Sequence, residues 1–228
     1  VLGALHQIIP DFVPAEGCGA LCNFQLYFRP RRDGNHGPEA RHAAVLMFNC
    51  GGSGARPELD GMNATAFPSG VMTMPVEATE QVGPVIIWRK ELRPDSGGAG
   101  RFRGGLGQYM EVGAQEGYEF DFQAMLDRVH HPARGRRGGA DGAPTTIARD
   151  DGVAMTGKGK QFVRPGRRVL MAFPGGAGYG PPEARDPALV RRDLALGYIT
   201  PEAAKRLYGL SEDAVAEIMA AAARGEDL

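Results

Sequence analysis

The chain has almost no surplus of either charge, because 26 Lys and Arg residues stand against 27 Asp and Glu residues, for a formal net charge of −1. Nucleic acids and anionic lipid surfaces attract proteins largely through a basic excess, so this balance disfavours both as partners. Long hydrophobic runs are also missing: one of the longest, 43–48, falls far short of the roughly 20 residues that cross a bilayer. We therefore expect a soluble protein with no nucleic-acid and no membrane partner.

Cysteine is scarce, and no second cysteine pair accompanies the C-x₃-C spacing near the start of the chain. The three cysteines are Cys18, Cys22 and Cys50. A zinc site needs about four nitrogen or sulfur ligands. The nearest histidines are His6, His36 and His42. They could complete such a site, but the glycine and apolar neighbours of the cysteines suit ordinary burial better. With no secretory signal at Val1–Leu5, we expect reduced thiols, a cytoplasmic location and no metal bound by this chain.

Glycine, in contrast, is abundant, with 34 residues concentrated in blocks. Three blocks lie between Asn49 and Gly107, at 51–54, 97–100 and 104–107. Each glycine gives up more backbone entropy on folding than any other residue. Its repeated use therefore implies either turns with positive φ or backbone that closely approaches another chain or a ligand. We expect these blocks to form shaped surfaces.

The middle of the chain is rich in strand patterns. Val85–Leu92, with its β-branched and aromatic residues, is the strongest of them. The exposed hairpin loop predicted at 31–38 joins the first two strands, and the glycines of 134–142 require a loop. The predicted strands are 23–28, 44–48, 85–92, 109–112, 119–125, 145–148, 160–163 and 166–173.

The character of the chain changes after Gly180. Helical spacing follows at 186–196, Thr200 and Pro201 are typical of an N-cap and a first helical position, and 211–224 is an alanine-rich helix. A short helix is also predicted within 2–9. The sequence thus predicts an α+β fold: a predominantly β body with glycine-rich loops at 1–183 and a helical C-terminal tail at 184–228.

The glycine-rich segments do not match a phosphate-binding loop. The segment 174–180 lacks the Gly-Lys-Ser/Thr ending that places a cation on phosphates, and it runs into Pro181-Pro182, where no helix N-terminus offers free N–H groups. In the block 98–104, Arg101 and Arg103 could bind an anion, and an interface loop is the alternative.

Polar residues between the blocks include two carboxylates, Asp60 and Glu77. If 75–80 is extended, Glu77 and Glu80 point to opposite faces, and if it is helical they share one. Hydroxyls such as Ser69 have no histidine nearby in the sequence, so a local Ser-His dyad is not suggested.

The order of these motifs closely resembles the hydantoinase B family, which includes N-methylhydantoinase B, the C-terminal part of 5-oxoprolinase and subunits of acetone and acetophenone carboxylases. The motifs are Gly51-Gly52-Ser53-Gly54-Ala55, Asp60-Gly61, Phe67-Pro68-Ser69-Gly70, Pro75-Val76-Glu77, Glu91 to Gly105, Gly138 to Gly142, Pro174 to Gly180 and Gly197 to Gly209. Family members are usually more than twice as long, and this chain resembles only their C-terminal portion.

The resemblance implies part of the B-type subunit of an ATP-dependent hydrolase of cyclic amides such as hydantoin, oxoproline or a lactam. The ring would open through a phosphorylated amide intermediate and a metal-activated water. The implied partners are a hydantoinase A type ATP-binding subunit and the N-terminal portion of the B-type subunit. ATP and a divalent metal are expected in the complex, both bound outside this chain. A subunit of a ketone carboxylase and a non-catalytic assembly module are the alternatives.

Under this resemblance the glycine loops would shape a substrate chamber or a subunit contact. The expected catalytic residues are Asp60 and Glu77, and the expected substrate-binding residues are Gly52, Ser53, Ser69, Arg101 and Arg103. Simpler alternatives are that Asp60 caps the turn at Gly61, that Glu77 pairs with an arginine, and that the two arginines are solvated interface charges. No metal ligand is carried over to this chain.

Overall fold

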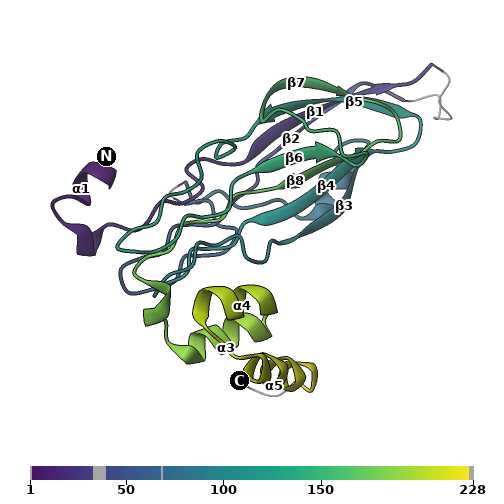
Figure 1. Ribbon diagram of the computed structural model, residues 1–228. Helices are drawn as coiled ribbons and strands as arrows, with labels where there is room; N and C mark the ends of the chain where they lie inside the picture. Colours follow the sequence, from purple (N-terminus) through teal and green to yellow (C-terminus); the bar gives the residue numbers. More distant parts are fainter. Residues whose placement is uncertain (1, 33–39, 68, 226–228) are drawn as a thin grey trace.

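The computed structural model describes residues 2–32, 40–67 and 69–225 and confirms an α+β fold (Figure 1). Within these residues, eight strands form two four-stranded sheets in which every pairing is antiparallel. One sheet has the order β2 (Ala43–Met47), β1 (Asn23–Pro30), β5 (Tyr118–Met125) and β7 (Lys158–Val163). The other has the order β3 (Val85–Leu92), β4 (Gln108–Ala114), β8 (Val169–Ala172) and β6 (Thr146–Arg149).

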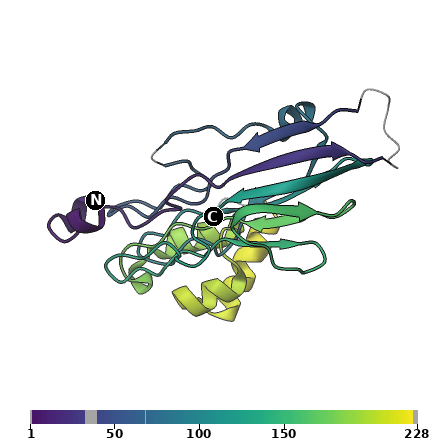
Figure 2. The same ribbon diagram turned by 90° about the horizontal axis from the view of Figure 1, so that it is seen from above.

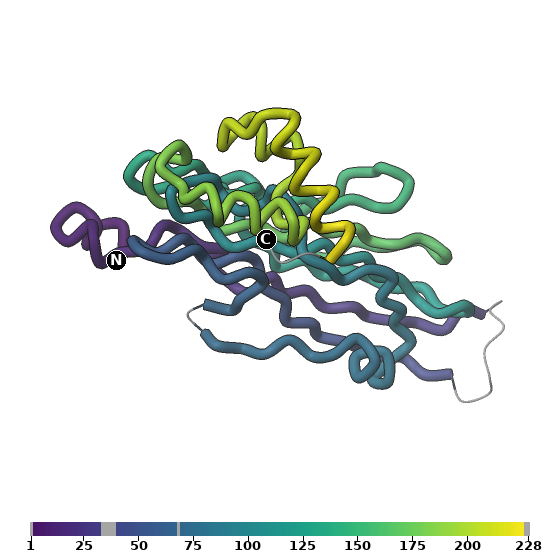
Figure 3. Tube along the Cα trace, turned by 90° about the horizontal axis from the view of Figure 1, so that it is seen from below, coloured from purple at the N-terminus to yellow at the C-terminus, as the bar shows by residue number. Residues whose placement is uncertain are grey.

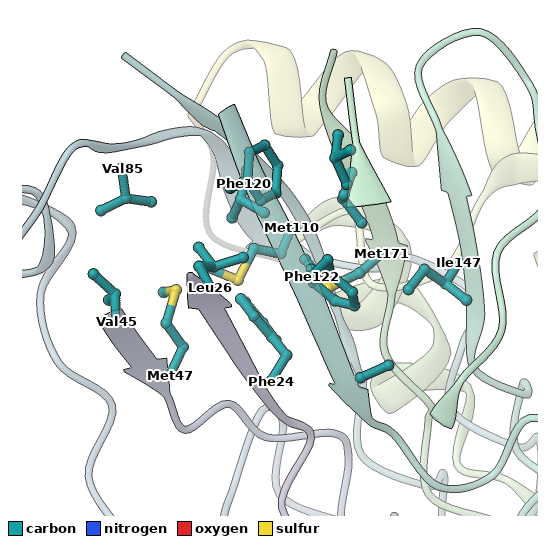
Figure 4. Packing of buried hydrophobic residues seen from close by; sticks show 14 of the residues in the cluster. Phe24, Leu26, Val45, Met47, Val85, Met110, Phe120, Phe122, Ile147 and Met171 are labelled. Atoms are coloured by element: carbon teal, nitrogen blue, oxygen red, sulfur yellow. The ribbon is translucent and has the colours of Figure 1, made fainter. Parts of the chain in front are cut away.

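The main hydrophobic core lies between the two sheets (Figure 4). Burial alternates along β1, so that Phe24, Leu26 and Phe28 face inward, as the period of two in a strand requires. Phe24 stacks on Phe122 with ring centroids 5.1 Å apart, and the same cluster includes Met110 of the opposite sheet. Each fully buried side chain of this size contributes about 1.5–3 kcal/mol. The predicted strands are therefore confirmed as the body of the protein.

The glycine-rich blocks lie beyond one end of the sandwich as extended segments that run side by side (Figure 2). We call the segments 51–55, 96–107, 133–143 and 174–180 the glycine bundle. The last of them is bonded to all three others, through Gly52 N to Pro174 O, Gly176 N to Gly105 O and Gly178 N to Ala140 O, each 2.9 Å. A strand in a sheet has at most two hydrogen-bonded neighbours. This segment has three, so the arrangement is a bundle and not a sheet.

Glycine is required in this bundle because the backbones touch. A Cβ on Gly176 would lie 1.8 Å from Ser53 O, and one on Gly104 would lie 2.0 Å from Gly176 O. Neither residue has positive φ. The expectation of close approach is confirmed, but the neighbour is backbone of the same chain. The expectation of shaped surfaces is wrong for Gly104, which is buried.

The C-terminal helices are α3 (Pro187–Ala195), α4 (Pro201–Tyr208) and α5 (Glu212–Ala223), and they lie along one side of the glycine bundle (Figures 1 and 3). They share a small core that includes Val190, Leu194 and Ile218. Thr200 is the N-cap of α4, as predicted, because its hydroxyl accepts from Ala203 N at 3.2 Å. The helical tail is thus confirmed, while its division from the body at residue 184 stays a prediction.

Four short helical elements complete the described chain. They are α1 (Leu2–Leu5), the 3₁₀ turns η1 (Pro10–Phe12) and η2 (Pro182–Ala184), and α2 (Val76–Gln81). None of the described helices combines the length and the apolar character that crossing a membrane requires. The predicted loop at 31–38 falls largely outside the described residues, and the strands that flank it, β1 and β2, pair as a hairpin would.

The close backbone approach makes a specific prediction for Gly176→Ala. The new Cβ would meet a backbone oxygen that cannot move aside, so we expect a loss of about 3 kcal/mol or more in the free energy of unfolding. Gly3→Ala is the control, because its Cβ would make only an ordinary contact of 3.6 Å. Urea unfolding of both variants checks this, and equal stability of the two would contradict the bundle packing.

Candidate functional site

Two of the predicted site residues, Asp60 and Arg103, belong to a buried ionic cluster with Arg185 and Asp193. Arg185 donates to Asp60 Oδ1 at 2.7 Å and to Asp193 Oδ2 at 2.7 Å. Arg103 Nε donates to the same Asp193 oxygen at 2.9 Å. The side chains of Arg185 and Asp193 are fully buried, and Asp60 retains 17% exposure. Arg192, which is 49% exposed, adds a third guanidinium group 3.7 Å from Asp60 Oδ2. Two carboxylates therefore face two buried arginines and one at the surface.

The ionic cluster lies where the glycine bundle meets the helical tail. Arg103 comes from the bundle, Asp193 from α3 and Arg185 from the turn between η2 and α3. Burial alone would raise the pKa of Asp60, but the hydrogen bond and charge of Arg185, with Arg103 behind it, outweigh burial and hold that pKa below its ordinary value. Asp60 is thus a carboxylate that stays ionised at neutral pH and joins two parts of the fold. This geometry is that of a structural anchor and not of a free general base.

Arg103 is buried and largely committed to partners inside the protein, so its expected role in binding an anion stays a prediction. Its side chain is 3% exposed, and besides Asp193 it donates to Gly104 O at 2.6 Å and approaches Asn63 Oδ1 at 3.4 Å. Arg101 differs, because it is exposed and its guanidinium lies 5.3 Å from the ring centroid of Phe102.

The remaining predicted residues do not converge with the ionic cluster. Gly52 is buried within the glycine bundle, and Ser53 beside it accepts a hydrogen bond from Met62 N at 2.7 Å. Ser69 is exposed, with its hydroxyl 3.4 Å from Ala66 O. Glu77 is exposed in the first turn of α2, so the helical alternative for this segment holds.

A groove of about 820 Å³ opens beside the bundle, between the N-terminal segment and residues 53–62. Apolar side chains form much of its wall, including Phe12, Leu59 and Phe67. Ser53 is the one predicted site residue that lines it. The N-terminal segment lies at the end of the molecule away from the sheets (Figures 1 and 2).

The polar side of this groove is built around Glu16. Its carboxylate oxygens lie 2.6 Å from Arg134 Nη2, 3.2 Å from Arg128 Nη1 and 3.6 Å from Arg136 Nη2. Burial alone would raise the pKa of Glu16, but the hydrogen bonds and charges of Arg134 and Arg128 outweigh it and lower that pKa. Sequence reasoning missed this group, because Glu16 lies more than a hundred residues from its partners. The density of arginine at 128–137 was the available signal.

The three cysteines are free and buried, and burial raises the pKa of each thiol, most strongly that of Cys22. Within the described ranges, no group of three or more His, Cys, Asp and Glu side chains could hold a metal ion. His36 lies outside those ranges. The described residues therefore offer no fit for a divalent metal.

Comparison with known proteins gives a consistent result. A family model described as Hydantoinase B/oxoprolinase matches residues 1–182. Caprolactamase subunit beta of Pseudomonas jessenii is 30% identical, over 92% of this chain and 37% of that protein. The acetophenone carboxylase delta subunit of Aromatoleum aromaticum is 29% identical, over 75% of this chain and 30% of that protein.

The same likeness appears in three dimensions. The crystal structure of the ATP-dependent caprolactamase from Pseudomonas jessenii superimposes with a TM-score of 0.76 and 26% identity, covering 95% of this chain and 40% of that one. The chain therefore spans about two fifths or less of the length of these relatives.

The ionic cluster predicts a large effect for Asp193→Asn. Removing this charge leaves two buried guanidinium groups short of a partner, so we expect a loss of about 3–5 kcal/mol in the free energy of unfolding. Glu217→Gln is the matched control on the same helical tail, because its pairing with Arg191 is exposed and contributes about 0–1 kcal/mol. Chemical denaturation measures both, and a loss below about 1 kcal/mol for Asp193→Asn would rule out the anchoring role.

A second prediction concerns pH. The pKa of Asp60 is lower in the folded than in the unfolded state, so its contribution to stability is present above the unfolded value of about 3.9 and disappears as pH falls through the lower folded value. The difference in unfolding free energy between the unmodified protein and Asp60→Asn should therefore shrink from pH 6 to pH 3. A pH-independent difference in urea titrations would show that the charge of Asp60 is not what stabilises.

Proposed function

Because this chain belongs to the hydantoinase B/oxoprolinase family, we propose that it forms part of the B-type subunit of an ATP-dependent cyclic-amide hydrolase. The observation that carries the proposal is the likeness to caprolactamase, in sequence over 92% of the chain and in structure over 95%. The hydrolysed bond is an amide of a ring such as a lactam, a hydantoin or oxoproline.

The chemistry of such a ring explains the need for ATP. An amide carbonyl is a poor electrophile, and phosphorylation of its oxygen makes the carbon more electrophilic. Water then adds to that carbon, the ring C–N bond breaks as the nitrogen takes up a proton, and the acyl phosphate that remains is hydrolysed to a carboxylate and phosphate. A divalent metal, for which the described residues of this chain offer no fit, would be held by another part of the complex and would lower the pKa of a bound water. Both ATP and the divalent metal belong to the parts of the complex outside this chain, which include a hydantoinase A type subunit and the N-terminal portion of the B-type subunit. A cytoplasmic location, where ATP is supplied, forms part of the proposal.

In the proposed complex, this chain contributes a closely packed body with an open groove. The glycine bundle and the ionic cluster hold the groove wall at 53–62, and Ser53 reaches that wall. Gly52 and Ser53 are proposed to define the shape of the substrate chamber. Glu77, Ser69 and Arg101 remain proposed contacts for a neighbouring subunit or its substrate, because all three are exposed.

Ketone carboxylation is the second candidate, and the likeness to the acetophenone carboxylase delta subunit favours it. It uses the same scaffold, since 29% identity to that subunit stands close to 30% identity to caprolactamase subunit beta. A third reading, a non-catalytic assembly module, is favoured by the commitment of Asp60 and Arg103 to the ionic cluster.

The test is activity of the full-length protein mixed with its candidate ATP-binding partner. We expect ADP formation that requires both proteins and a cyclic amide, tested with 5-oxoproline, hydantoin and ε-caprolactam, together with the ring-opened product by mass spectrometry. ADP formation that requires acetone or acetophenone and labelled bicarbonate would replace hydrolysis by carboxylation. A stable complex inactive with both substrate sets would support the assembly module.

A further inference from the structure

We propose that the groove beside the glycine bundle is a binding site for a small organic acid. Arg128 and Arg136 receive its carboxylate, and Phe12, Leu59 and Phe67 hold its apolar body. This inference concerns binding by the described residues themselves, and it holds whichever reaction the complex performs.

The first argument is an uncompensated positive charge. Arg128 and Arg136 line the groove with side-chain exposures of 20% and 16%, and between them stands a single carboxylate, Glu16, at 19%. Arg134 also pairs with Glu16 but is 70% exposed, so water screens its charge.

Asp11, Arg56 and Glu58 also line the groove, but all three are exposed, so water screens their charges too. Among the less exposed groups one positive charge remains, in a partly desolvated place where an unpaired charge is costly. A ligand with a single negative charge balances it.

The second argument is the geometry of Arg136. Its Nη2 lies 3.6 Å from Glu16, which is beyond hydrogen-bond distance. Its Nε is buried and has no hydrogen-bond partner among the residues that the structure describes. A guanidinium group offers a planar set of donors that matches the two oxygens of a carboxylate. Arg136 lines the groove, and Glu16 does not satisfy its guanidinium group, so this group can turn a donor toward a ligand there.

The surroundings carry the same positive field. Burial and the charges of Arg136 and Arg137 lower the pKa of His6, since they disfavour a further positive charge. Arg137 is paired with Asp11 at 3.1 Å on the exposed rim, so that pair adds no net charge. The excess positive charge thus lies with Arg128 and Arg136.

The third argument is the apolar wall. Phe12 is 81% exposed, Leu59 55% and Phe67 49%, although all three face the same groove. A volume of about 820 Å³ lies within the usual range of about 300–1,000 Å³ for small-molecule sites. Apolar walls around one anion-binding end favour a carboxylate on a hydrocarbon body over a highly charged phosphate.

Arg128 is held toward the groove by a strained backbone. Its φ is +60°, which a residue with a side chain adopts only at a cost of about 1–2 kcal/mol. Its guanidinium also approaches Cys18 O and Pro132 O, each at 3.4 Å, which keeps it beside Glu16. This orientation is fixed before any ligand arrives, so binding needs little rearrangement.

The test is calorimetric titration of the full-length protein with 4-phenylbutanoate and with its uncharged amide, in the absence of ATP and of any partner subunit. We expect the acid to bind at least about tenfold more tightly than the amide, because charge-assisted hydrogen bonds contribute about 1.5–3 kcal/mol. Equal affinity of the two probes would overturn the proposal. Lack of binding, as when another part of the subunit covers the groove, would also overturn it.

Variants separate the roles of the groove residues. Arg136→Gln should weaken acid binding about tenfold or more and leave the amide unchanged, and Arg136→Lys should restore part of the loss. Phe12→Ala should weaken both probes, and its high exposure means that folding is not at stake. Arg167→Gln is the matched control, since it removes an exposed arginine paired with Asp150. A loss as large for Arg167→Gln as for Arg136→Gln would contradict a specific site.

Failure of this binding is distinguishable from failure of the proposed function. The titration needs neither ATP nor a reaction, so an inactive protein that binds the acid supports the groove and rejects the hydrolase. Cyclic-amide hydrolysis by a protein that does not bind the acid supports the proposed function and rejects the acid-binding groove.

Discussion

The structure depends on direct contact between backbones. In the glycine bundle, four extended segments approach so closely that backbone oxygens occupy the space where side chains would begin. Hydrogen bonds then run from one segment to several neighbours. Packing of this kind gains little from large apolar side chains, so hydrogen-bond geometry and the absence of a Cβ at the contacting glycines define it. The sandwich lies at one end of this bundle, and the groove lies at its side.

The ionic cluster solves a problem that the bundle creates. A bundle with few side chains offers little hydrophobic surface on which helices can dock. Arg103 is one of the long side chains within it and pairs directly with Asp193 of α3, while Arg185 bridges Asp193 and Asp60. Buried ion pairs contribute less to stability than to specificity in some proteins, because a misplaced partner leaves a charge uncompensated. The pairs here fix where the helical tail meets the body.

Much of the fold could be predicted from local patterns. Strands such as 85–92 and the N-cap at Thr200 were correct because alternation and capping act over a few residues. Tertiary partners were not predictable in this way. The local sequence favours a catalytic or binding role for Asp60 and Arg103, because their structural partners, Arg185 and Asp193, lie 90 or more residues away in the chain.

The groove escaped prediction for the same reason. Glu16 stands alone in its local sequence, and nothing near it indicates that Arg128 and Arg136 lie alongside. Blocks of glycine predict surface turns, because turns are where glycine most often occurs. Buried extended segments can contain the same run of glycines without positive φ, and only the positions of the neighbouring segments distinguish a buried segment from a turn.

The order in which the chain is made matters for the glycine bundle. Its segments at 51–55, 96–107, 133–143 and 174–180 are separated by loops and strands, and the last of them bonds to all the others. Closing such distant contacts costs chain entropy that no local structure offsets, so topologies of this kind fold slowly. During synthesis, groups such as Gly52 N and Gly105 O, whose partners lie in 174–180, stay hydrated until that segment leaves the ribosome. Once the two sheets pair, they hold the ends of these segments near one another, which shortens the loops that the bundle has to close.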